Sequence, residues 1–373
     1  MTDDRWLLNS DSEAIKVTAL FASSLSPLYE SYIACRIKMS RLEEMYLVTN
    51  AADLDEVREE ICATDLEEQM ITAGSLGRIS VATSAMCLSN KLQACLPQLL
   101  ALFNATDVSH SISPAAAALL EEVRLIILCA HYLLTDDNSG ETPQIPDAIV
   151  QACSVDEAAF NSISGLISAF MSLAEQQASG ITIRPEDPRL SPLIGQTLLS
   201  FFARWAPAYV APSAENYDTA YHGKGALVAW SGADSGPGMI NFCITLCLHY
   251  FCFWPQETLV QQGAASLIFA LALRKDLRQS LVNSPSFDQL ATLQIVSTSI
   301  SHASSVVPPG TDTGGISTAH LQGFSRLPYV SRAKILSALL VASSEADSKS
   351  QPIFEKLLQT LESVFVSLVE GLK

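Results

Sequence analysis

The stretch that most constrains the fold is Ser191–Tyr209, whose pattern predicts one strongly apolar helix. Ser191 is a residue type that favours the N-cap, and Pro192 suits the first helical position because no backbone donor is needed there. Pro207 predicts that the helix kinks or closes near its end. At 3.6 residues per turn the apolar and aromatic side chains form one stripe, and only another apolar helix can cover it. We therefore predict a core made of Ile194, Leu198, Phe201, Phe202, Trp205 and Tyr209.

Similar patterns recur along all 373 residues, so the predicted fold class is all-α. No alternating run of Val, Ile or Thr between turn residues predicts a strand. The predicted helices span 12–22, 27–48, 53–77, 80–104, 114–135, 146–152, 156–178, 192–210, 238–253, 256–282, 286–303, 325–343 and 351–372. Successive helix pairs occupy about 40 residues, the length of a HEAT or armadillo unit. This spacing predicts a HEAT/armadillo-like α-solenoid of stacked antiparallel helix hairpins, with residues 1–373 as one continuous segment.

Three stretches interrupt the apolar pattern. Residues 212–238 and 304–323 are rich in Gly, Ser and Pro, and they predict flexible loops. The third is an acidic insertion at about 43–68, and residues 41–70 supply eight of the 17 net negative charges. Two interpretations stay open for it: a solvated insertion, or a surface that steers a basic protein partner towards the chain. The candidate protein-binding residues are Glu43, Glu44, Asp53, Asp55, Glu56, Glu59, Glu60, Asp65, Glu67 and Glu68.

The charge balance argues against two classes of partner. The chain has 22 basic and 39 acidic residues, whereas nucleic acids and anionic membrane surfaces attract basic proteins. The longest apolar run, 239–254, is interrupted by Asn241 and His249 and is shorter than the ~20 residues that a membrane span needs. We predict a buried helix there and no membrane insertion. The N-terminus is too acidic for a targeting peptide, and the odd number of nine cysteines predicts reduced thiols in the core.

No group of residues predicts catalysis, a metal or a cofactor. Ser235 and His320 superficially resemble a protease pair, but their order is reversed and their flanks are helical. A zinc site is not predicted, because the candidate ligands point to different helix faces. Those ligands are Cys243, Cys247, Cys252 and His249. The sequence Gly223-Lys224-Gly225 lacks the strand and helix of a phosphate-binding loop.

The predicted helix 114–135 and the residues just after it contain polar side chains. We interpret them as structural and not functional. His131 lies in an apolar run and is predicted to be a core histidine with satisfied hydrogen bonds. The pairs Glu121-Glu122 and Asp136-Asp137 are predicted to be solvated surface charge.

Five short motifs follow one another along the chain. They are Ser31-Tyr32-Ile33 with Cys35, Gly74–Ile79, Gly140–Pro146, Arg204-Trp205 with Tyr209 and Asn216–Asp218, and Ser231–Asp234. In order and spacing, from about residue 26 to 300 and more weakly to 343, they resemble the exportin-4 family of the importin-β superfamily. The departures from the family pattern are the lengths of the loops 212–238 and 304–323.

The resemblance implies the middle portion of a nuclear export receptor, built as a HEAT-repeat solenoid. Such a receptor binds protein cargo together with GTP-bound Ran, passes nuclear pore proteins and shuttles between nucleus and cytoplasm. The resemblance also implies that most Ran contacts lie in repeats outside this chain, while the acidic insertion favours a basic cargo. The alternative function is a free-standing helical-repeat adaptor without Ran dependence. A fragment, a short gene model and a diverged paralogue all stay open.

Overall fold

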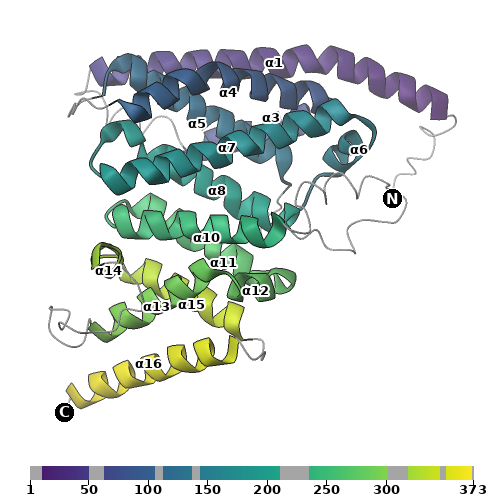
Figure 1. Ribbon diagram of the computed structural model, residues 1–373. Helices are drawn as coiled ribbons and strands as arrows, with labels where there is room; N and C mark the ends of the chain where they lie inside the picture. The colour runs from purple at the N-terminus through teal and green to yellow at the C-terminus, as the bar shows by residue number, and fades with distance from the viewer. Residues whose placement is uncertain are drawn as a thin grey trace.

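The structure is a computed structural model that describes residues 11–49, 63–105, 112–136, 143–210, 235–300, 318–344 and 350–371. Within these residues every regular element is a helix, apart from an isolated antiparallel bridge between Asp136 and Gln144. The helices pack in adjacent pairs, and the stack runs from α1 at one end to α16 at the other (Figure 1). This arrangement confirms the prediction of an all-α fold of the solenoid type.

The elements follow the predicted order. They are α1 (Asp11–Thr49), α3 (Ala63–Gly77), the 3-10 turn η3 (Arg78–Ser80), α4 (Val81–Asn104), α5 (Pro114–Leu134), α6 (Asp147–Val155), α7 (Glu157–Ile183), the 3-10 turn η4 (Pro188–Leu190), α8 (Pro192–Tyr209), α10 (Ser235–Phe253), α11 (Thr258–Leu273), α12 (Lys275–Val282), α13 (Pro285–Ile300), α14 (Thr318–Ser325), α15 (Tyr329–Ser343) and α16 (Ser350–Gly371). Most of the loops predicted at 212–238 and 304–323 lie outside the described residues. The described ends of both predicted loops are wrong, because residues 235–238 form the first turn of α10 and residues 318–323 belong to α14.

Three predicted helix boundaries are wrong. Helix α1 runs through Pro27 without a break, because Pro27 lies on the exposed side, where water can replace the lost backbone bond. The predicted helix 256–282 divides at Arg274 into α11 and α12, and the guanidinium of Arg274 donates to the carbonyl of Pro207 at 2.8 Å. The predicted start at 325 is wrong because residues 318–325 form the separate helix α14.

The helices form two rows. One row contains α4, α7 and α10, and the other contains α5, α8, α11 and α15 (Figure 1). Helices α1 and α3 both pack on α5. One apolar core runs through both rows and includes the predicted buried helix at 239–254, which corresponds to α10. Among the described residues, no helix combines the length and apolar character that a bilayer span requires.

Contacts at the helix ends show that helices within a row run in the same direction. Arg184, just after α7, donates to the carbonyls of Phe103 and Ala105 at the end of α4. Tyr209, at the end of α8, donates to the carbonyl of Leu134 at the end of α5, at 2.5 Å. The last carbonyls of a helix have no partner within it, so these contacts satisfy them and fix the register between repeats.

Helix α8 lies at the centre of the stack, between α5 and α11. Its six predicted core side chains are all 3% exposed or less. Trp205 stacks on Phe201 and on Tyr209, with ring centroids 6.1 and 5.7 Å apart. The helix ends two residues after Pro207. Ser191 holds the N-cap position, but its side chain makes no capping hydrogen bond and its φ is 44°.

Candidate protein-interaction site

The ten acidic candidate residues do not form one surface in the described structure. Five of them lie outside the described residues: Asp53, Asp55, Glu56, Glu59 and Glu60. The side chain of Asp65 is also outside the described ones. The remaining four divide between two places, with Glu43 and Glu44 near the end of α1, and Glu67 and Glu68 on α3.

Neighbouring glutamates near the end of α1 have different surroundings. Glu43 forms an ion pair with Arg36 on the same helix, at 3.6 Å. Glu44 lines a cavity of about 350 Å³ between the end of α1, the start of α5 and the turn from η4 into α8. Of the candidate residues described, Glu44 is therefore the one that combines a carboxylate with this apolar recess.

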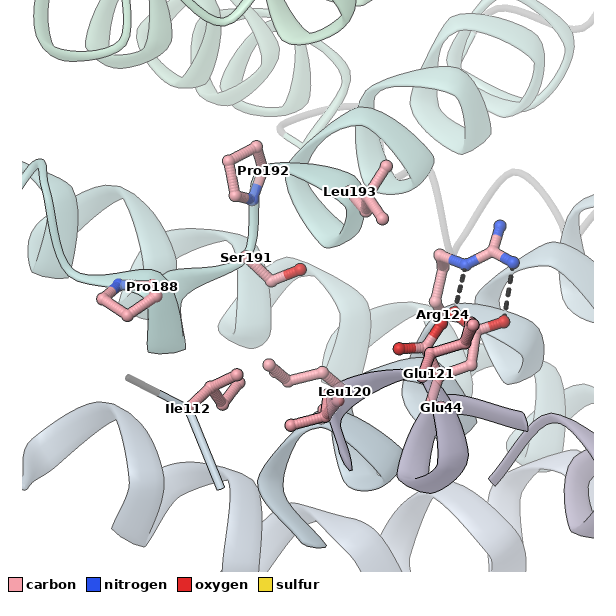
Figure 2. A pocket seen from close by; sticks show the side chains of 12 residues that line it. Glu44, Ile112, Leu120, Glu121, Arg124, Pro188, Ser191, Pro192 and Leu193 are labelled. Carbon is pink, nitrogen blue, oxygen red and sulfur yellow. Dashed lines mark hydrogen bonds and ion pairs between the residues drawn. The ribbon is translucent and has the colours of Figure 1, made fainter. Parts of the chain in front are cut away.

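The recess has an apolar end and a charged end. Its apolar lining includes Leu47, Ile112, Leu120, Pro188, Pro192 and Leu193. Figure 2 shows Glu44, Glu121 and Arg124 together at one end, and Ile112 and Pro188 at the other. This recess could not be predicted from the sequence, because its walls come from three segments far apart in the chain. The only local signal is the proline-rich turn at 188–192.

The charged end is built around a bidentate ion pair. Arg124 donates through Nε and Nη2 to the two carboxylate oxygens of Glu121, at 2.6 and 2.7 Å. Burial alone would lower the pKa of Arg124, but the hydrogen bonds and charge of Glu121, followed by the charge of Glu44, outweigh it and raise the pKa. Glu122 pairs with Arg41. The prediction that Glu121 and Glu122 are solvated charge is therefore wrong, because cations on α5 itself and on α1 neutralise them.

Contacts with neighbouring elements hold the walls of the recess in place. Ser113 caps α5 by accepting a hydrogen bond from the backbone N–H of Ala116 at 3.2 Å, with Pro114 at the first helical position. At the other wall, the buried amide of Gln177 donates to the carbonyls of Leu190 and Ser191. Tyr250 in turn donates to Gln177 Oε1 at 2.6 Å. This buried chain of hydrogen bonds explains how Ser191 keeps its positive φ.

Glu67 and Glu68 on α3 do not line this recess. The hydroxyl of Tyr132 donates to Glu67 at 3.0 Å, and burial, followed by this contact and the charge of Glu67, raises the pKa of Tyr132 to about 12. Glu68 borders a separate, open cavity of about 470 Å³ beside Tyr32 and Leu76. Both glutamates are exposed, and Glu67 has a structural partner in Tyr132.

Two of the sequence motifs meet at the end of α5. Arg78 donates to the carbonyls of Leu133, Tyr132 and Thr135, at 3.1, 2.7 and 2.7 Å. A β-carbon at Gly74 would overlap the carbonyl oxygen of Tyr132, so only glycine permits this approach of α3. Arg204 of the Arg-Trp motif contacts the same turn through His131 and the ring of Tyr132.

His131 is the buried histidine of this junction. Its Nε2 lies 2.9 Å from Nη1 of Arg204, so the neutral ring accepts there and carries its proton on Nδ1. Burial, followed by the charge of Arg204, lowers the pKa of His131 to about 3. Among the described residues Nδ1 has no hydrogen-bond partner, so the prediction of a fully satisfied core histidine is only half right.

The residues considered for chemistry have structural surroundings. Burial raises the pKa of Cys243 and of Cys252 to about 12, which keeps both thiols protonated. His320 packs edge-on against Phe253, with ring centroids 5.3 Å apart, and the side chain of Ser235 lies outside the described ones. In the part of the chain that the structure describes, no three or more His, Cys, Asp or Glu side chains are grouped so that they could hold a metal ion.

Comparison with known proteins supports a family assignment. A family model described as Exportin-4 matches residues 15–305. The chain is also similar to Exportin-4 of Dictyostelium discoideum, with 22% identity over 288 residues. That alignment covers 73% of this chain and 24% of the relative, so the chain spans about a quarter of the relative's length.

Proposed function

The chain belongs to the exportin-4 family, and from that premise we propose that it is a segment of a nuclear export receptor. The family match over residues 15–305 carries this proposal. Under this proposal, the whole receptor binds a protein cargo together with GTP-bound Ran, passes nuclear pore proteins and shuttles between nucleus and cytoplasm. The segment contributes a scaffold and part of the cargo surface, and it catalyses no reaction.

Helix α1 supports the proposal that the segment is part of a longer stack. One face, with Tyr29, Ile33 and Ile37, is buried. A second apolar stripe lies on the same helix and includes the half-buried Tyr32. Its members are alternately four and three residues apart, which places them on one side of the helix. Its exposed members are Leu28, Cys35, Met39, Leu42 and Tyr46.

Inner helices of the stack use two faces, as α8 does against α5 and α11. A further receptor helix packed on the exposed stripe of α1 would continue the stack in the same way. Upstream sequence separates this proposal from the adaptor alternative. In-frame helical repeats before the codon for Met1 support a receptor segment, and an upstream region that encodes none favours a free-standing adaptor.

Net charge supports a basic cargo. The chain carries 17 net negative charges, and the acidic insertion is the densest part of that charge. Steering by such charges weakens as salt rises, because the screening length is about 8 Å at physiological ionic strength. We therefore expect a basic partner to bind weakly and to lose affinity with salt. Since the Ran contacts are proposed to lie in other repeats, GTP-loaded Ran should not change that affinity.

The experiment is a titration of this chain with a fluorescent polylysine peptide, at low and high salt, with and without GTP-loaded Ran. A variant with Glu56, Glu59 and Glu60 replaced by Gln tests the insertion; these positions lie outside the described residues. Binding that salt does not weaken, and that the triple variant leaves unchanged, would remove the insertion from the proposal. Tighter binding with Ran would mean that this segment itself contacts Ran.

A further inference from the structure

Helices α8, α11 and α15, which follow one another along the stack, repeat a polar pattern on their exposed side (Figure 1). The fifth residue of α8 and of α11 is a glutamine, and the ninth residue of all three helices is a serine. These residues are Gln196, Gln262, Ser200, Ser266 and Ser337. We call the surface that they form the glutamine–serine face.

Two contacts show that the members of this face lie side by side. A β-carbon at Gly263, the residue after Gln262, would lie 3.9 Å from the backbone oxygen of Gln196. On the other side of α11, Nζ of Lys334 on α15 donates to the hydroxyl of Ser266 at 2.8 Å. The glutamine–serine face is therefore continuous over three helices.

The side-chain amides of Gln196 and Gln262 can bind a ligand. Across the described residues, neither of them makes a hydrogen bond within the protein. The buried Gln177 and Gln261, in contrast, donate to backbone carbonyls. An amide both donates and accepts, so it can pair with the backbone of an extended peptide, whereas an α-helix has already paired its own backbone groups.

The spacing of the glutamines fits a polyproline II peptide that crosses the helices. Packed helices lie about 8–10 Å apart, and this is the separation expected between equivalent positions of α8 and α11. A polyproline II chain has three residues per turn and rises ~3.1 Å per residue, so equivalent backbone groups on one side are ~9 Å apart. Residues on one side of a β-strand are only ~7 Å apart.

Helix α11 adds apolar surface beside the glutamine. It contains no charged residue, and its exposed stripe includes Leu259, Phe269 and Leu273. The two leucines are 53% and 55% exposed, and Phe269 is half-buried against the core. An apolar side chain of the ligand that lies beside Gln262 would cover Leu259 or Phe269 and remove apolar surface from water on both partners.

The charge of the face favours an acidic ligand. Helices α8, α11 and α15 contain no Asp or Glu, although the chain has 39 acidic residues. Lys334 places a cation on the face, and its hydrogen-bond partner Ser266 is uncharged. The acidic residue just before α11, Glu257, lies about 14 Å from Ser266 along the helix axis, which exceeds the screening length of about 8 Å. A ligand carboxylate is therefore attracted to Lys334.

We propose that the glutamine–serine face binds an acidic, apolar segment of a partner protein in the polyproline II conformation. Gln196 and Gln262 hold the backbone of this segment, and Lys334 pairs with one of its carboxylates. The proposal does not rest on the proposed function, because it concerns a different surface and a ligand of the opposite charge.

The test follows the anisotropy of a fluorescent peptide, four copies of Pro-Leu-Glu, titrated with the whole chain. Two unlabelled peptides compete: four copies of Pro-Leu-Lys, which reverse the charge, and four copies of Ala-Leu-Glu, which favour an α-helix. The face variants are Gln196→Ala, Gln262→Ala and Lys334→Gln. The matched controls on α4, in the other row, are Gln93→Ala, exposed like Gln262, and Lys91→Gln, half-buried like Lys334.

We expect the Pro-Leu-Glu peptide to bind and neither competitor to displace it. Each glutamine variant should weaken binding about fivefold through lost hydrogen bonds. Lys334→Gln should weaken it about threefold and reduce its dependence on salt, because an ion pair at a partly exposed site is lost. Both controls should bind like the wild type, and every variant should keep the same helical circular dichroism spectrum.

Three results would overturn the proposal. The first is no binding of the Pro-Leu-Glu peptide. The second is displacement by either competitor as readily as by unlabelled Pro-Leu-Glu, and the third is face variants that bind like their controls. If polylysine binds and Pro-Leu-Glu does not, the face proposal fails and the proposed basic cargo stands. If Pro-Leu-Glu binds as expected and polylysine does not, the face proposal stands and the proposed basic cargo fails.

Discussion

Replacing Arg78 with alanine should destabilise the end of α5 by about 3–4 kcal/mol. Arg78 is only 15% exposed, and its guanidinium donates to three carbonyls at the end of α5. Hydrogen bonds from a charged donor contribute about 1.5–3 kcal/mol each. The expected loss is below the sum of three, because water enters the space left by the side chain. The ion pair with Asp136 adds little, since that carboxylate is 59% exposed.

The assay is hydrogen exchange of peptides from α5, because a stacked-repeat protein opens locally rather than as a whole. A loss of 3 kcal/mol corresponds to an exchange rate roughly 150-fold faster at the end of α5. Arg78→Lys should recover less than half of the loss, because an ammonium cannot reproduce the planar fork of donors. Arg326→Ala is the control, since Arg326 is exposed, and it should change stability by less than about 0.5 kcal/mol. An effect of Arg78→Ala below 1 kcal/mol, or full recovery by lysine, would refute the reasoning.

Four further substitutions test the packing and the buried histidine. Gly74→Ala should cost about 2–3 kcal/mol in urea unfolding because its β-carbon meets the backbone of Tyr132, whereas Gly165→Ala, with open space around it, should stabilise α7 by up to about 1 kcal/mol. Trp205→Ala should cost about 3–5 kcal/mol, and a loss below 1 kcal/mol would contradict its burial. His131 has a folded pKa of about 3 and an unfolded value near 6.5, so its contribution to stability is present above pH 6.5 and is lost as the pH falls towards 3. Between pH 7 and pH 5 this loss is about 2 kcal/mol, and urea unfolding of His131→Gln at both pH values should show a pH dependence smaller by that amount.

The helical fold could be predicted from sequence because helical periodicity is local. Each turn of α8 repeats its apolar positions within a few residues, and the pattern therefore identifies the buried face without knowledge of the partner helix. Helix boundaries are less local. The pattern predicted a break in α1 near Pro27, where the helix continues, and one helix across Arg274, where a contact with α8 separates α11 from α12.

The candidate site could be predicted only as a charge pattern. The acidic residues near the end of α1 are plain in the sequence, but nothing local distinguishes Glu43, which pairs with Arg36, from Glu44, which borders the recess. Their side chains point in different directions around the helix, and the elements that meet them there are remote in sequence. Leu193 was likewise absent from the predicted core stripe, and its role at the recess depends on the turn held by Gln177.

The sequence by itself therefore determined the helices, the core stripe of α8 and the family, since each depends on residues within a short window or on motifs in a fixed order. Tertiary structure alone decided where helix ends meet and which recess forms. Arg78 and Leu133 are 55 positions apart, yet one donates to the other. The glycine at position 74 matters because a distant backbone passes against it. Such contacts depend on how successive hairpins stack, and no local pattern encodes that distance or angle.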